Sequence, residues 1–187
     1  MLEKRNLSEA AQWFLEDFQG LLNNFAQDEG VQITLLDKNG DLITEIEGSQ
    51  RVCKLIRSQE EGRTKCEDGY KMGFSLAKVQ QEPVFVECFA GFSSVWLPII
   101  VKGATLGMIV ACGKRDVIKD DKEKLTAKFS KMADDLVIMD KEGFLRAGVE
   151  EVELTNSLEV KDRADKLLKL IRILEETART PLKEIFG

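Results

Sequence analysis

Apolar side chains recur every three or four residues near the start of the chain, which predicts an amphipathic helix from Ser8 to about Gln27. Ser8 is suited to cap the first turn of this helix, and Gly30 is suited to end it. The apolar stripe is formed by Leu7, Ala11, Phe14, Phe18, Leu21, Leu22 and Phe25.

The pattern then changes to the alternation that is typical of β-strands. Residues 31–37 and 42–48 are predicted to form two strands. Asn39-Gly40 between them predicts a tight hairpin, because both residues tolerate a positive φ. Residues 51–81 are then expected to be helical in two pieces, with a break near Gly62.

Three more strands are expected between Pro83 and Gly113, the last two joined through Lys102 and Gly103, and a helix follows over residues 119–139. Consecutive antiparallel strands with helices gathered beside them predict an α+β fold. The order of elements is similar to that of PAS and GAF sensory domains, so we expect a PAS/GAF-like antiparallel sheet flanked by helices, with an appended C-terminal helix.

That C-terminal helix is predicted over residues 158–180, which lack glycine and proline. Its apolar residues alternate four and three apart, as in a heptad seam. One interpretation is a dimerising signalling helix, and the other is a terminal helix docked on its own domain, which the off-seam Leu168 and Ile173 favour. We therefore divide the chain into a sensory domain, residues 1–150, and a C-terminal signalling or dimerisation helix, residues 151–187. The seam consists of Val160, Ala164, Leu167, Ile171, Leu174 and Ala178.

Composition narrows the classes of function. The 187 residues carry a formal net charge of −6, with 43% hydrophobic and 32% charged residues, and an isoelectric point near 5.0. An acidic chain is not expected to bind nucleic acid.

We recognise neither a signal peptide nor a membrane span, so we expect a cytoplasmic protein with no membrane partner and with reduced cysteines. Histidine is absent, which removes the commonest general base.

All four cysteines fall within one third of the chain, between residues 51 and 115, at Cys53, Cys66, Cys88 and Cys112. Four thiolates together would select zinc or an iron–sulfur cluster. The spacing does not itself indicate such a site, because no two of them form the CxxC pair that compact metal sites use. The alternative is that each cysteine packs as a small hydrophobic residue.

The segment that contains these cysteines resembles the PocR sensory domain, a family found in regulators and sensor kinases. The resemblance covers about residues 7–140 and is most specific over residues 51–113. The pieces that carry it are CKLI at 53–56, KCEDG around Cys66, PVFVECFAGF at 83–92, LPII at 97–100 and LGMIVACG at 106–113.

This resemblance implies a PAS-like or GAF-like fold that binds a small molecule, such as a diol, and signals through a fused transcription factor, kinase or cyclase domain. The chain departs from the family pattern twice. Phe89 stands where the family often has histidine, and Cys112 stands near a position often held by glycine or glutamine. The first change removes a polar group from the expected site, and the second adds a fourth sulfur. An iron–sulfur cluster suits a redox or gas sensor better than zinc, which has no redox chemistry.

The turn after Cys88 supplies the candidate ligand-binding residues. They are expected to line a mostly apolar pocket, although packing in an ordinary core explains the same residues. Ser94 is a further hydrogen-bond donor or turn cap, and Gly107 is either a close approach to a ligand or a bend in the sheet. The expected ligand-binding residues are Phe89, Ala90, Gly91, Phe92, Ser93 and Trp96.

No catalytic motif is recognised: the chain has no P-loop, GxSxG elbow, HExxH pair or EF-hand loop. We therefore expect a small-molecule or redox sensory domain in signal transduction, not an enzyme. It would form a homodimer or act through a partner signalling protein, because no output domain is recognised. The alternatives are a metalloprotein that carries a cluster for electron transfer and a purely structural dimerisation module.

Overall fold

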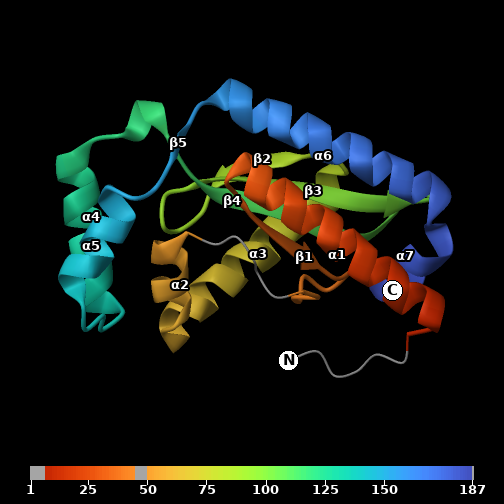
Figure 1. Cartoon of the computed structure of the whole chain (residues 1–187), viewed down its shortest axis with the longest axis horizontal. Coiled ribbons are helices and arrows are strands. Elements are labelled where there is room, and N and C mark those ends of the chain that lie inside the picture. The colour runs from red at the N-terminus through yellow and green to blue at the C-terminus, as the bar shows by residue number, and fades with distance from the viewer. Residues whose placement is uncertain (1–6, 45–49, 187) are drawn as a thin grey trace.

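The computed structural model describes residues 7–44 and 50–186 of the chain. The helices and strands in these ranges are joined mostly by short turns (Figure 1). In chain order they are α1 (Glu9–Glu29), β1 (Gln32–Leu36), α2 (Arg51–Arg57), α3 (Glu60–Gln80), β2 (Val84–Glu87), β3 (Ser93–Val101), β4 (Ala104–Asp116), the 3₁₀ helix η1 (Val117–Lys119), α4 (Lys122–Asp135), α5 (Lys141–Val149), β5 (Leu154–Thr155), α6 (Ser157–Thr177) and α7 (Arg179–Phe186).

The sheet has the strand order β1-β4-β3-β2, and all neighbours on this path are antiparallel. The short strand β5 adds a parallel pair to the end of β4. Because β1 lies at one edge and β2 at the other, the intervening helices α2 and α3 carry the chain across one face of the sheet. The prediction of an α+β fold with an antiparallel sheet flanked by helices is confirmed.

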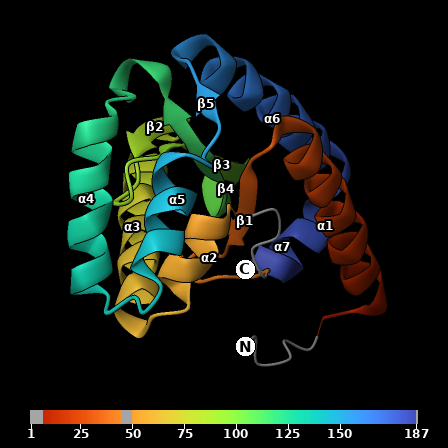
Figure 2. The same ribbon diagram turned by 60° about the vertical axis from the view of Figure 1, so that its left-hand side comes forward.

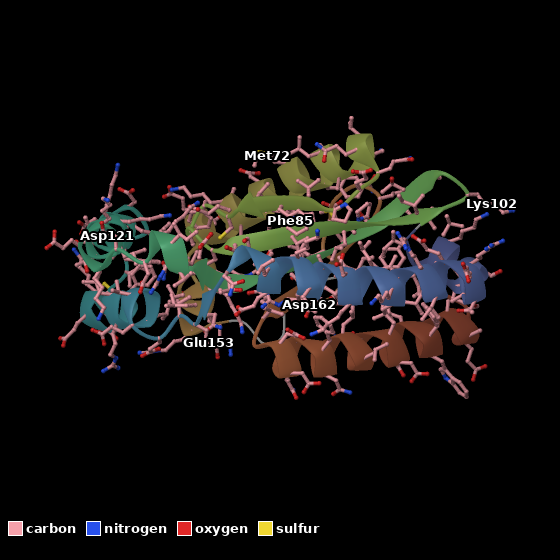
Figure 3. The ribbon with its side chains drawn as sticks, turned by 90° about the horizontal axis from the view of Figure 1, so that it is seen from above. Met72, Phe85, Lys102, Asp121, Glu153 and Asp162 are labelled. Carbon is pink, nitrogen blue, oxygen red and sulfur yellow. The ribbon has the colours of Figure 1, made fainter. Side chains whose placement is uncertain are left out.

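Both faces of the sheet are covered, so its strands are apolar almost throughout instead of alternating (Figure 2). Helices α1, α6 and α7 cover one face, where they pack on Val95, Leu97 and Ile109. Helix α3 covers the other face, where it packs on Trp96 and Val110. Helices α4 and α5 form a third cluster with α2 at one end of the molecule, and the β3–β4 turn at Lys102 lies at the other end (Figure 3).

The predicted first helix is confirmed together with both of its ends. The Ser8 hydroxyl accepts a hydrogen bond from the Ala11 N–H at 3.2 Å. Gly30 ends the helix with φ of +61°, in the left-handed region that glycine adopts without strain.

The heptad seam of the last long helix faces the sheet of its own chain. Ala164, Leu167 and Ile171 are buried in the core that α1, α6 and α7 share with the strands, and Figure 3 shows α6 lying alongside both α1 and the strands. The docked interpretation is therefore the one the structure supports, and the seam is not free to form a coiled coil. The boundary at residue 150 and dimerisation through another surface stay predictions.

The chain turns back at Asn39-Gly40 as predicted, where the Asp37 N–H donates to the Asp41 carbonyl at 2.9 Å, but the geometry of the turn is not the expected one. Gly40 has a positive φ of +82°, but Asn39 does not. The turn is held by the Asp37 carboxylate, which accepts hydrogen bonds from the N–H groups of Asn39 and Asp41 at 2.8 and 3.1 Å. A single bridge joins Leu36 to residue 42, and residues 45–49 of the expected second strand lie outside the described ranges.

The predicted break near Gly62 lies instead at residues 58–59, between α2 and α3. Gly62 is inside the first turn of α3, where a Cβ would lie 2.2 Å from the Ile56 carbonyl oxygen. This glycine is needed for the close approach of the two helices, which the sequence pattern alone does not distinguish from a helix break.

The helix predicted over residues 119–139 is shorter at both ends, as α4 (Lys122–Asp135), and α5, β5 and α7 were not expected. Arg115 attaches α5 to the sheet: its guanidinium donates to the carbonyls of Gly148 at 2.9 Å and Val149 at 3.0 Å, and to the Asp120 carboxylate at 2.8 Å. Within the described residues, the structure has no helix of the length and apolarity that a membrane crossing requires.

Candidate functional site

A row of polar side chains crosses three strands on the face of the sheet that α3 covers. In the antiparallel register, Cys112 on β4 is paired with Gln32 on β1 and with Ser94 on β3. Residues paired across neighbouring strands point to the same face. The sheet therefore presents an amide, a thiol and a hydroxyl side by side in an otherwise apolar surface.

Helices α2 and α3 each place a cysteine and a larger polar residue over this row. Cys53 and Arg57 are four residues apart on α2, and Cys66 and Tyr70 are four residues apart on α3. Residues at this spacing share one face of a helix, so both pairs face the sheet. Gly69 lies beside Tyr70, where a Cβ would have no other atom within 4 Å.

The turn between β2 and β3 closes a third side of the site. The Cys88 N–H donates to the Phe92 carbonyl at 2.9 Å, and the Gly91 N–H donates to the Cys88 carbonyl at 2.8 Å. Gly91 has φ of +92°, which glycine adopts readily. This turn directs the backbone N–H groups of Phe92, Ala90 and Gly91 toward the Cys88 thiol, where they act to lower its pKa against the larger effect of burial.

Together these elements enclose a pocket of about 400 Å³, within the usual size range of small-molecule sites. Asp68, Met72 and Glu87 are exposed residues of its lining and form its rim. The deeper lining comes from the sheet, α2, α3 and the β2–β3 turn, and comprises Gln32, Cys53, Ile56, Arg57, Lys65, Cys66, Gly69, Tyr70, Cys88, Phe89, Ala90, Phe92, Ser94, Trp96, Val110 and Cys112.

The structure places most of the expected ligand-binding residues in this lining. Phe89, Ala90, Phe92 and Trp96 contribute to it, whereas Gly91 and Ser93 do not. Gly91 shapes the turn, and Ser93 precedes Ser94, which does line the pocket. Since side chains alternate along a strand, only one of two neighbouring serines on β3 faces the pocket. Binding by these residues stays a prediction.

Gly107, the other glycine considered as a point of close approach, lies away from the pocket. A Cβ there would lie 2.3 Å from the Phe186 ring and 2.5 Å from the Leu36 carbonyl oxygen. Gly107 thus admits the C-terminal helix α7 against the sheet, which is a packing role.

All four cysteines line the pocket as free thiols, and each is partly exposed. Burial raises the pKa of Cys53 to about 12 and that of Cys66 to about 11, with the neighbouring thiols adding to the rise. Burial also raises the pKa of Cys88 and, most strongly, that of Cys112. The thiols are therefore protonated at neutral pH.

The metal prediction finds no support in the arrangement of these sulfurs. Within residues 7–44 and 50–186, no group of three or more cysteine or carboxylate side chains is placed to hold a metal ion. The four cysteines share a pocket without forming a set of ligands around one point. Whether a cluster binds stays a prediction.

Three polar residues that the sequence analysis did not select form one corner of the pocket. The Tyr70 hydroxyl oxygen accepts from Gln32 Nε2 at 3.3 Å and from an Arg57 guanidinium nitrogen at 3.4 Å. Gln32 is only 2% exposed, and its Oε1 has no hydrogen-bond partner. A buried amide oxygen without a partner is costly, which marks this corner as a place where a polar ligand group would be stabilised.

Two signals in the sequence could have found this corner. Arg57 and Tyr70 each follow a pocket cysteine by four residues, one helical turn. Gln32 is a polar residue inside an apolar strand, and a polar side chain at a buried position needs a hydrogen-bond partner. The sequence could not show that three separate elements converge.

Comparison with known proteins identifies a family and one curated relative. The sequence model of a family described as "Sensory domain found in PocR" matches residues 14–178, which include the sheet, the pocket and α6. Over 94 residues the chain is 26% identical to the Regulatory protein PocR of Salmonella typhimurium, an alignment that covers 50% of this chain and 31% of that protein. No solved structure matches the chain.

Proposed function

Because this chain belongs to the family of sensory domains found in PocR, we propose that it senses a small organic molecule bound in the pocket between the sheet and helices α2 and α3. The observation that carries this proposal is the pocket itself: about 400 Å³ of space, walled by aromatic and aliphatic side chains, with a few buried polar groups. This combination is typical of small-molecule sites.

The position of the pocket suits a signalling role. Its lining combines residues of α2, α3, β1, β3, β4 and the β2–β3 turn, so an occupant contacts elements that are far apart in the sequence. A ligand that binds one arrangement of these elements more tightly shifts the population toward it. We propose that the output is a change in how the domain contacts a partner signalling protein or a second copy of itself.

A pair of glycine substitutions tests the proposal. Gly69→Leu would place a side chain in the pocket, whereas Gly20→Leu makes the same change on the exposed face of α1, where a Cβ also meets no atom within 4 Å. We expect thermal-shift screening of a small-molecule library to find compounds that stabilise the natural chain and Gly20→Leu but not Gly69→Leu. Equal stabilisation of both variants, or none of any, would contradict the proposal.

A cluster-bearing redox sensor is the second candidate, and one observation favours it. The Cys88 sulfur lies against backbone N–H groups, which is how proteins stabilise cluster sulfurs, and the other three thiols face the same pocket. Binding would require the sulfurs to move together and lose their protons. Anaerobically purified protein should then absorb in the visible range and lose this absorbance in Cys88→Ser. Colourless protein without iron, sulfide or zinc would exclude a cluster and a zinc site alike.

We further propose that the domain binds its ligand without converting it, because no catalytic motif is recognised in the sequence. We also propose that it acts in the cytoplasm, where free cysteines such as the four in the pocket stay reduced. Homodimerisation would use a surface other than the α6 seam. Sedimentation with and without a stabilising compound tests this, and a monomer under both conditions would remove the homodimer.

A further inference from the structure

The charges around the pocket are not distributed evenly. Glu87 on the rim pairs with Lys119 and lies 4.0 Å from Lys128, and Lys65 pairs with Glu61 at 2.7 Å. Arg57 reaches deeper, is half-buried, and takes part in none of the ion pairs formed among the described residues. A guanidinium keeps its positive charge at any ordinary pH. The inner pocket therefore has a cation without an anion.

The groups beside Arg57 are hydrogen-bonding residues that are neutral at pH 7. Tyr70 accepts from both Arg57 and Gln32, and it has a proton of its own to donate. The Gln32 amide has one end without a partner. Rotating this amide by 180° would let Oε1 accept the Tyr70 proton and leave Nε2 free, so that Gln32 offers a donor to a ligand in place of Tyr70.

We propose that the ligand is a small monocarboxylate whose carboxylate binds at the corner formed by Arg57, Tyr70 and Gln32. This inference rests on the proposed function. The apolar body of the ligand would lie against Trp96, Phe92 and Val110 in the same lining. Arginine binds carboxylates through two parallel hydrogen bonds, and this corner has an arginine with an unused charge beside two buried polar residues.

The rest of the pocket restricts the charge of this ligand. A cationic ligand would be repelled by Arg57. A dianion such as a phosphate would find only one cation among the described lining residues, Arg57, outside an ion pair, and it would meet the rim carboxylates of Asp68 and Glu87 on entry. A single negative charge joined to an apolar body matches one unpaired, half-buried cation in an apolar pocket.

Matched acids and alcohols test the inference by calorimetry on the full chain. The probes are hexanoate against 1-hexanol and 3-phenylpropionate against 3-phenyl-1-propanol, each pair differing in the charged group alone. We expect the acid of at least one pair to bind about tenfold or more tightly than its alcohol. Arg57→Gln should weaken the acid about ten- to hundredfold and leave the alcohol unchanged.

Two further variants keep the test independent of folding. Arg63→Gln makes the same substitution at an exposed position of α3 outside the pocket and should leave both probes unaffected. Gln32→Glu keeps the size of the side chain but adds a negative charge, so it should weaken the acid and not the alcohol. A loss of both probes in Arg57→Gln would indicate structural damage and would contradict the proposed role.

The outcomes separate this inference from the proposed function. Equal affinity for acid and alcohol in the natural chain overturns the carboxylate preference. If library compounds stabilise the chain in a manner that Gly69→Leu abolishes, yet neither acid binds, the inference is wrong and the pocket remains a sensory site. If no library compound binds in the pocket, both fail.

Discussion

Gly73 on α3 lies directly against the indole of Trp96 on β3: a Cβ at residue 73 would lie 2.4 Å from Trp96 Cε2 and 2.8 Å from Nε1. The missing side chain lets the helix approach the sheet, and it brings the helix against an aromatic ring that also lines the pocket. One glycine thereby sets both the packing of α3 and the shape of the site.

The first prediction follows from this contact. Gly73→Ala should lower the free energy of unfolding by about 1–3 kcal/mol, because the added methyl group overpacks the helix against the indole. Gly69→Ala on the same helix should instead raise it by about 0.5–1 kcal/mol, because its Cβ meets open space and alanine favours the helix. Urea denaturation measures both. Stabilisation by Gly73→Ala would show that α3 lies farther from the sheet.

The second prediction concerns the buried guanidinium that attaches α5 to the sheet. Arg115→Lys keeps the charge but cannot reach two carbonyls and a carboxylate at once, so we expect a loss of about 1–3 kcal/mol in stability. Arg63→Lys, on an exposed face, should change stability by less than about 0.5 kcal/mol. Equal effects of the two substitutions in urea denaturation would contradict the role assigned to Arg115.

The third prediction compares two isoleucines on α6. Ile171 is 2% exposed against the sheet, and Ile173 is 58% exposed. Ile171→Ala should cost about 2–5 kcal/mol of stability, whereas Ile173→Ala should cost less than about 0.5 kcal/mol. If Ile171→Ala instead dissociated a dimer and left the monomer fully stable, the heptad seam would be an interface between chains after all.

The fourth prediction concerns the reactivity of the thiols with pH. A pKa raised from 9.0 to about 11 at Cys66 leaves about a hundredfold less thiolate at pH 8 in the folded chain than in the unfolded chain. Alkylation by iodoacetamide, followed by mass spectrometry, should therefore be slow and should still accelerate with pH above 9, where the unfolded chain levels off. A folded-state rate that levels off near pH 9 would contradict the raised pKa.

The same shifts predict how stability changes with pH. The thiols of Cys53 and Cys66 hold their protons more tightly in the folded chain than in the unfolded chain. Their contribution to stability is therefore complete below about pH 9 and is lost as the pH rises toward 11 and 12. Cys66→Ser should make the free energy of unfolding less sensitive to pH over this range.

The sequence predicted the local elements of this fold better than their association. The cap at Ser8, the end at Gly30 and the strands of the β3–β4 hairpin follow from local rules of spacing and turn chemistry. Gly62 was misplaced as a break because a glycine that permits close packing and one that ends a helix look alike in a sequence. The short elements α5, β5 and α7 are determined by tertiary contacts such as those of Arg115 and Phe186.

The candidate site was predicted in part. The turn after Cys88 and the four cysteines were selected because they are clustered in the sequence, and they do share one pocket. The corner of Gln32, Arg57 and Tyr70 was missed, since these residues come from β1, α2 and α3 and meet only because the two helices pack on the sheet. Proximity that depends on how helices pack on a sheet cannot be read from spacing along the chain.

Fluorescence of Trp96 tests the central claim, that a small molecule binds in this pocket, most directly. The chain has two tryptophans, and Trp13→Phe removes the exposed one, which leaves the indole in the pocket lining as the reporter. A compound that raises the melting temperature should shift or quench the emission of Trp96 with the same concentration dependence, and it should do neither in Gly69→Leu. A stabilising compound that leaves this emission unchanged would place its binding site elsewhere and contradict the account.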